Sequence, residues 1–165
     1  MSPKESGVIL VVDDEDSVLV TYRLILEQQG YTVTACGTSR DAISAIEKIN
    51  FDLVLCDYSL EEQHTGFEVI AAARKRDPLI PAALLTGYAT KETADEAASQ
   101  NIGIMFKPIE IEEFLATTSK MLRRTNESSQ ETAEKDSSSP QQDRNQVKRG
   151  HGHARRRSAG GTTKR

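Results

Sequence analysis

Short apolar runs alternate with amphipathic stretches along the first 125 residues of the chain. A continuous apolar run bounded by turn residues is typical of a strand buried on both faces, whereas apolar residues that recur every three or four positions indicate a helix. This pattern predicts strands at 8–12, 31–36, 51–57, 80–86 and 102–107, and helices at 16–29, 39–49, 66–76, 91–100 and 111–124.

Five strands separated by helices of this length predict an α/β fold. The sheet should be parallel, with right-handed crossovers and helices on both of its faces. Asp16 or Ser17 is expected to cap the first helix and Ser39 the second, because short polar side chains stabilise helix N-termini. The 91–100 helix has a small apolar face, since only alanines are available for burial. We therefore expect this helix to be weakly anchored and easily displaced.

Polar residues stand where the predicted strands end. Asp13 and Asp14 follow the first strand, Asp57 ends the third, Thr86 ends the fourth and Lys107 ends the fifth. The carboxyl ends of parallel strands share one edge of the sheet, where ligands bind in folds of this class. Three carboxylates brought together repel one another unless a cation joins them, and oxygen ligands without His or Cys favour Mg²⁺. A carboxylate nucleophile, a hard cation, a lysine and a hydroxyl suit phosphoryl transfer to Asp57.

These residues lie in four fragments, which are Val11–Glu15, Asp57, Leu84–Gly87 and Phe106–Pro108. With these fragments in this order, residues 7–124 resemble the receiver domain of two-component response regulators, of the kind found in single-domain chemotaxis regulators. The resemblance implies a flavodoxin-like, doubly wound, five-stranded parallel sheet of order 2-1-3-4-5 with five helices. It also implies that Asp57 accepts a phosphoryl group from a sensor histidine kinase or a phosphotransfer protein.

The same resemblance implies a role for each matched position. Asp14 and Asp57 would bind Mg²⁺ directly, Asp13 would act mainly through water, and the backbone carbonyl of Ser59 would complete the protein ligands. Lys107 would contact the phosphoryl oxygens, and its peptide bond to Pro108 is expected to be cis. Thr86 would turn its hydroxyl to the acyl phosphate and displace the loop that follows. The signal would then reach the face formed by the 91–100 helix, the fifth strand and the last helix.

Two positions depart from the pattern of that family. Ile104 stands three residues before Lys107, where receivers commonly carry Tyr, Phe or His. The loop 58–65 has Glu61 where a proline is usual, and it is one residue longer than is common. We expect this loop to change access to the acyl phosphate.

Two alternatives remain open. An aspartyl-phosphate phosphatase of the haloacid dehalogenase type uses similar chemistry, although Asp57-Tyr58-Ser59 lacks the second aspartate of that family. A degenerate receiver would bind partners without being phosphorylated, and the complete acidic set argues against it. The preferred interpretation is a signalling domain that promotes only its own phosphorylation and dephosphorylation, rather than an enzyme.

The distribution of charge divides the chain at about residue 125. Residues 1–125 carry 12 Lys/Arg and 20 Asp/Glu, a net charge of −8, whereas residues 126–165 carry 9 and 5, a net charge of +4. The expected organisation is therefore a receiver domain at 1–125 and a disordered tail at 126–165, because the tail has no apolar periodicity. From residue 144 onward the tail has only basic charges, so it could contact nucleic acid, an anionic membrane surface or the protein's own acidic face.

Forty residues without a core cannot form a helix-turn-helix domain, so no DNA-binding domain is expected in this chain and its output should be made by contact. Cys36 and Cys56 both fall in predicted strands and are expected to be small buried side chains in a reducing compartment. The sequence shows neither a signal-peptide pattern nor an apolar run long enough to cross a membrane. We therefore expect a cytoplasmic protein.

Overall fold

The computed structural model describes residues 6–136. Its strands are β1 Val8–Val12, β2 Thr32–Cys36, β3 Leu53–Asp57, β4 Ala82–Thr86 and β5 Gly103–Phe106. Its helices are α1 Asp16–Gln29, α2 Ser39–Lys48, α3 Gly66–Arg76, α4 Lys91–Ser99 and α5 Ile111–Asp136, and a short turn of 3-10 helix lies at Glu61–Gln63.

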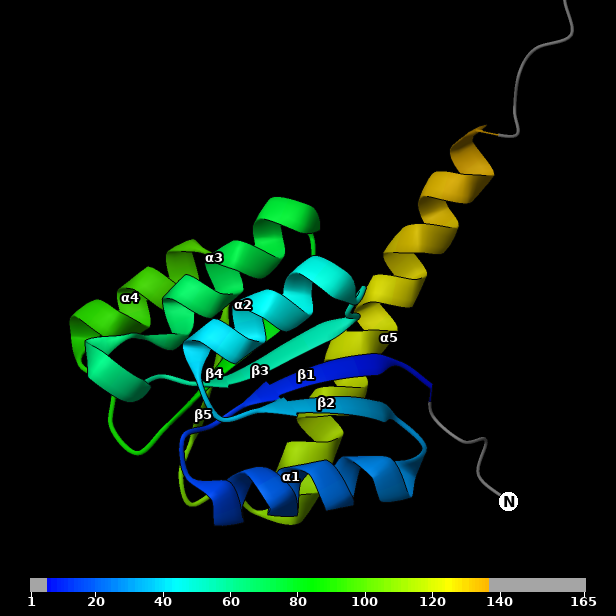
Figure 1. Cartoon of the computed structure of the whole chain (residues 1–165). Coiled ribbons are helices and arrows are strands. Elements are labelled where there is room, and N and C mark those ends of the chain that lie inside the picture. Colours follow the sequence, from blue (N-terminus) through cyan, green and yellow to red (C-terminus); the bar gives the residue numbers. More distant parts are fainter. Residues whose placement is uncertain (1–5, 137–165) are drawn as a thin grey trace, which may run out of the picture.

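The five strands form one parallel sheet in the order β2-β1-β3-β4-β5, which confirms the predicted fold class and strand order. Helices α2, α3 and α4 cover one face of the sheet, and α1 and α5 cover the other (Figure 1). Each face has its own apolar core, and the central strands β1 and β3 contribute to both. These strands are apolar at successive positions because both of their faces are covered.

The first two helices begin where the sequence indicates, but other residues cap them. Glu15 is the N-cap of α1 and makes no side-chain cap bond, so the expectation of Asp16 or Ser17 was wrong. Thr38 caps α2 by accepting a hydrogen bond from the Asp41 amide, which places Ser39 inside the helix. Several polar residues stand in a row at both starts, and the backbone conformation decides which one lies at the cap.

Helix α4 packs through an even smaller face than the sequence suggests. Ala97 is buried, but Ala94 and Ala98 are exposed, and Thr93 takes the second buried position. The hydroxyl of Thr90 accepts a hydrogen bond from the Thr93 amide and so caps the helix. Weak anchoring of α4 remains a prediction.

Helix α5 continues to Asp136, so the prediction that it ends near residue 124 and that disorder begins at 126 was wrong for 126–136. Burial ends near Leu122, and the apolar periodicity of the sequence indicates only the buried part of the helix. Neither Gly nor Pro interrupts 111–136, and each further residue of a formed helix adds a backbone bond without needing a buried face. The last turns of α5 project beyond the sheet (Figure 1). The rest of the predicted tail, 137–165, lies outside the described residues.

Within residues 6–136, no helix has both the length and the apolar composition needed to cross a bilayer.

Candidate functional site

Three carboxylates meet at the carboxyl edge of the sheet. Asp13 and Asp14 directly follow β1, and Asp57 is the last residue of the neighbouring strand β3. Oxygens of the three side chains lie within 4.8 Å of one another. Asp13 is completely buried, whereas Asp14 is exposed to solvent. The predicted convergence of these residues is therefore present.

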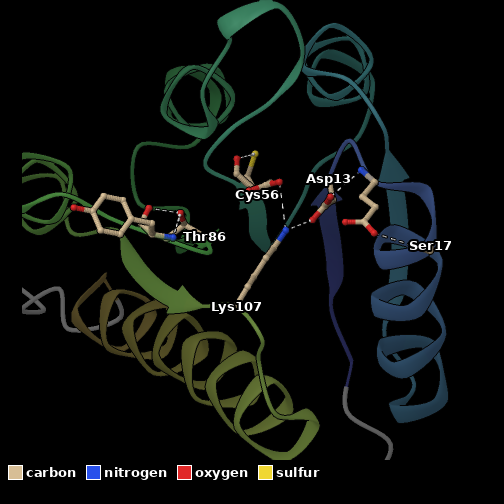
Figure 2. Close-up of polar contacts among 8 residues, drawn as sticks. Asp13, Ser17, Cys56, Thr86 and Lys107 are labelled. Carbon is tan, nitrogen blue, oxygen red and sulfur yellow. Dashed lines mark hydrogen bonds and ion pairs between the residues drawn. The ribbon is translucent and has the colours of Figure 1, made fainter.

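Lys107 reaches this cluster from the end of β5. Its Nζ lies 2.7 Å from Oδ2 of Asp13 and 3.3 Å from Oδ2 of Asp57, so one ammonium group bridges two carboxylates (Figure 2). The Lys107 amide donates a hydrogen bond to the Thr86 carbonyl, and the Lys107–Pro108 peptide is cis, as expected.

Burial and neighbouring charges perturb the site in opposite directions. Burial raises the pKa of the Asp57 carboxyl, the charges of Asp13 and Asp14 raise it further, and the Lys107 ammonium offsets only part of this effect. Burial alone would lower the pKa of Lys107, but its hydrogen bond to Asp13 and the charges of Asp57 and Asp13 raise it overall. Lys107 therefore carries a positive charge, and it only partly offsets the effect of burial and of the neighbouring carboxylates on Asp57.

The donor set fits a hard divalent cation. Both oxygens of Asp13 already have partners, because Oδ1 accepts a hydrogen bond from the Glu15 amide at 2.9 Å and Oδ2 contacts Lys107. Asp14 and Asp57 are then the carboxylates with oxygens free to bind a metal directly, and oxygen-only ligands favour Mg²⁺ over softer ions. For Ser59 the structure shows an antiparallel bridge to Thr65 in the following loop, and its role as a carbonyl ligand stays a prediction.

Thr86 ends β4 beside this cluster, but its hydroxyl is engaged elsewhere. It donates a hydrogen bond to the Tyr88 carbonyl at 2.6 Å and accepts one from the Tyr88 amide at 3.2 Å (Figure 2). Ile104, the departure from the usual aromatic, is partly buried and packs against the core on the α4 side of the sheet. Tyr88 itself is 76% exposed. The sequence offered no signal for this local bond, since it depends on how the loop after β4 turns.

The lengthened loop 58–65 is tied to α2. Leu60 is buried, and its amide donates a hydrogen bond to the His64 carbonyl, which closes the loop on itself. Oε1 of Glu61 accepts hydrogen bonds from the Ser39 amide at 2.7 Å and the Ser39 hydroxyl at 2.5 Å. Glu61, which replaces a proline, thus joins the loop to the first turn of α2. A carboxylate at a helix N-terminus also interacts favourably with the helix dipole.

Gly66 lies beside the site, and the sequence did not reveal why this position must be a glycine. Its amide donates to the Tyr58 carbonyl, and a Cβ at this position would lie only 2.5 Å from the Asp57 carbonyl oxygen. The backbone of the first turn of α3 therefore packs directly against the end of β3, with no room for a side chain between them. This contact sets the position of the strand end that carries Asp57.

A groove of about 570 Å³ opens beside Lys107, between α1 and the turn after β5. Its lining is largely apolar or hydroxylated: Ser17, Val18, Thr21, Tyr22, Pro108 and Ile109. The Tyr22 ring stacks on Phe114 with 4.7 Å between centroids, and burial raises the pKa of its hydroxyl. On the outer side of α1, Val20 and Leu24 are more than half exposed. An apolar surface thus adjoins the charged cluster.

Comparison with known proteins agrees with this geometry. Residues 9–119 match the family model described as the response regulator receiver domain. The chain belongs to this family. Phosphorylation on an aspartate and Mg²⁺ binding are general properties of such receivers, which are signalling domains of two-component systems.

Proteins of known sequence or structure resemble this chain over the receiver domain. The chain is 33% identical over 125 residues to the transcriptional regulatory protein ZraR of Escherichia coli K12, covering 75% of this chain but only 28% of ZraR. Among solved structures, a CheY-like receiver domain protein of Methanospirillum hungatei has a TM-score of 0.70 at 27% identity, covering 75% of this chain and 99% of that one. The chemotaxis protein CheY4 of Vibrio cholerae has a TM-score of 0.66, also at 27% identity, covering 71% of this chain and 99% of that one.

Proposed function

We propose that this receiver accepts a phosphoryl group on Asp57 from the phosphohistidine of a sensor kinase or a phosphotransfer protein. The observation that carries the proposal is the Lys107 ammonium bridging Asp13 and Asp57 at the edge of the sheet. It supports the proposal because a buried carboxylate beside a fixed cation, with further carboxylates available for Mg²⁺, is the arrangement that in-line phosphoryl transfer needs.

Each side chain has one task in the transfer. An oxygen of Asp57 attacks phosphorus while the phosphorus–nitrogen bond of the phosphohistidine breaks, and the ring nitrogen keeps that electron pair. Asp14, Asp57 and the Ser59 carbonyl would hold Mg²⁺, which when bound neutralises charge on the phosphoryl oxygens. Lys107 exchanges its contact with Asp57 for one with a phosphoryl oxygen, while its bond to Asp13 keeps it in place. The charge that Asp57 loses as a nucleophile is thus replaced by the charge of the phosphoryl group.

The apolar groove beside Lys107 is where we place the donor. A partner helix packed against Val18 and Ile109 would bring its histidine to the carboxyl edge of the sheet next to Lys107. Apolar contacts of this kind supply affinity without competing with the charged groups that carry out the transfer.

Signalling would begin at Thr86. Its hydroxyl must leave the Tyr88 backbone before it can donate to an acyl phosphate, and both hydrogen bonds to Tyr88 are then lost. The loop that follows leads directly into α4, which buries only Thr93 and Ala97. Phosphorylation would therefore shift an existing equilibrium of the loop and α4, and Ile104 need not move as an aromatic switch. The altered surface is that of α4, β5 and α5.

Incubation of the full chain with Mg²⁺ and acetyl phosphate, followed by intact mass measurement, tests the proposal. The native protein should gain the mass of one phosphoryl group, and Asp57→Asn should gain none. Asp41→Asn, which changes an exposed aspartate on α2, is the matched control and should behave as the native protein. An equal gain in Asp57→Asn would refute the assignment of Asp57. Steady hydrolysis of small phosphate esters without a stable adduct would instead favour a phosphatase.

We also propose a cytoplasmic location, as is usual for response regulators. Cys36 and Cys56 are both buried free thiols, in agreement with a reducing compartment. Burial, together with the charges of Asp57 and Asp13, raises the pKa of the Cys56 thiol well above its usual value, which keeps this thiol protonated and unreactive beside the site.

A further inference from the structure

We propose that the basic C-terminal segment 144–165 docks on the receiver's own output face. We define the output face as Tyr88, α4, β5 and residues 110–113. The proposal concerns the resting chain and does not depend on phosphorylation of Asp57. It combines an exposed aromatic surface, a local excess of acidic side chains and the chemistry of the segment that follows α5.

The output face exposes large apolar side chains at one corner of the sheet. Tyr88 is 76% exposed, Phe106 58% and Ile111 55%. Phe106 is the register partner of Thr86, and Tyr88 lies two residues beyond Thr86, so both rings belong to the same corner at the carboxyl edge. Arginine guanidinium groups stack on exposed aromatic rings more readily than other cations do.

The same face is strongly acidic. Residues 91–113 carry six acids, which are Glu92, Asp95, Glu96, Glu110, Glu112 and Glu113, and all six are exposed. The only cations in this stretch are Lys91, which pairs with Asp95 at 3.6 Å, and Lys107, which faces Asp13 and Asp57. The net charge of the stretch is −4.

Helices α2 and α3, which cover the same face of the sheet as α4, lack this complementarity (Figure 1). Residues 39–48 carry two bases and two acids, and residues 66–77 carry three bases and two acids. A basic segment is therefore attracted to the output face and not to α2 or α3.

The segment 144–165 has the composition that this face would bind. It contains eight Lys/Arg and no Asp or Glu, with three arginines in a row at 155–157. Its single large aliphatic residue is Val147, so its attraction to the face must come from charge and from stacking of guanidinium groups.

The length of the intervening chain permits the contact. Helix α5 rises about 1.5 Å per residue, so its 26 residues carry the chain roughly 39 Å from Ile111 to Asp136. The 18 residues 137–154 can span up to about 60 Å, which is more than the return distance from Asp136 to the start of α5. A tethered segment of this length acts at a high effective concentration, so weak charge pairs suffice. An output partner would then have to displace the segment.

Hydrogen exchange measured by mass spectrometry on the full chain tests the proposal. In R155S/R156S/R157S, peptides that cover 91–113 should exchange several-fold faster than in the native protein, while peptides from β1, β3 and α2 stay unchanged. Unchanged exchange in these three elements shows that the variant is folded. Raising NaCl from about 50 mM to about 500 mM should have the same effect on the native protein, because exposed charges are then screened.

Variants of the face supply the reciprocal test. Glu112→Lys should speed exchange in the 91–113 peptides of the native chain and have a much smaller effect in R155S/R156S/R157S. Glu47→Lys on α2 is the matched control and should leave these peptides unchanged. Equal exchange of 91–113 in native protein and R155S/R156S/R157S would overturn the proposal. Binding of duplex DNA or anionic vesicles by 144–165 without any protection of 91–113 would also overturn it, as would protection that appears only at high protein concentration.

Discussion

Replacing Gly66 by alanine probes the closest backbone contact of the site. An alanine Cβ would lie 2.5 Å from the Asp57 carbonyl oxygen and 2.6 Å from Cδ2 of Leu84. Ordinary contacts of a Cβ begin near 3.4 Å, so the start of α3 must retreat from β3 by roughly 0.9 Å. Leu84 is completely buried and Asp57 ends a central strand, so neither can yield easily.

The cost of this change follows from two opposing effects. Overpacking a buried contact typically costs about 1 to 3 kcal/mol. Alanine restricts the unfolded chain more than glycine does, which returns about 0.4 to 1 kcal/mol. We therefore expect Gly66→Ala to lower the free energy of unfolding by about 1 to 2 kcal/mol. The displaced Asp57 should also be phosphorylated more slowly, because in-line transfer depends on its position.

Urea unfolding provides the measurement. With m values of about 1 to 3 kcal/mol/M, the midpoint should fall by roughly 0.3 to 2 M without a change in m. Gly37→Ala is the matched control, because a Cβ at that position would have no atom within 4 Å. This control should be as stable as the native protein or slightly more stable. If Gly66→Ala and Gly37→Ala unfold at the same urea concentration, the steric argument is refuted.

Three further predictions concern α4, the acidic cluster and the metal. Arg74 donates hydrogen bonds to the carbonyls of Ile80, Gln100 and Asn101, so Arg74→Ala should lower stability by about 1 to 3 kcal/mol and speed hydrogen exchange at 97–103. Lys75→Ala, which changes an exposed neighbour on α3, should do neither. Without metal, the raised pKa of Asp57 means that this carboxyl binds more protons in the folded than in the unfolded state, so its contribution to stability should increase as pH falls through its folded pKa toward its unfolded value. Thermal unfolding in EDTA should show a smaller increase for Asp57→Asn, and an equal one would contradict this reasoning. Mg²⁺ at about 100 times its Kd should stabilise the native protein by about 2.7 kcal/mol and Asp57→Asn by much less, as judged from unfolding with and without the ion.

The sequence alone determined the order of the elements and the residues at the strand ends. Strand and helix patterns are local, and a parallel sheet necessarily brings the carboxyl ends of its strands to one edge. Asp13 and Lys107 are 94 positions apart, yet their meeting could be predicted from that topology. The aspartates and the lysine were therefore identified without coordinates.

Tertiary structure decided the features that depend on packing and on loop conformation. Only the fold shows that Thr86 forms a hydrogen bond with Tyr88 and that Glu61 accepts one from Ser39. Only the fold shows that position 66 has no room for a side chain. Each of these features depends on the conformation of a loop, which no periodic sequence pattern indicates. The true end of α5 was missed because a helix can continue after its buried face ends. Apolar periodicity indicates which residues are buried. The helix ends and loop conformations depend instead on hydrogen bonds and close contacts that form only in the folded chain.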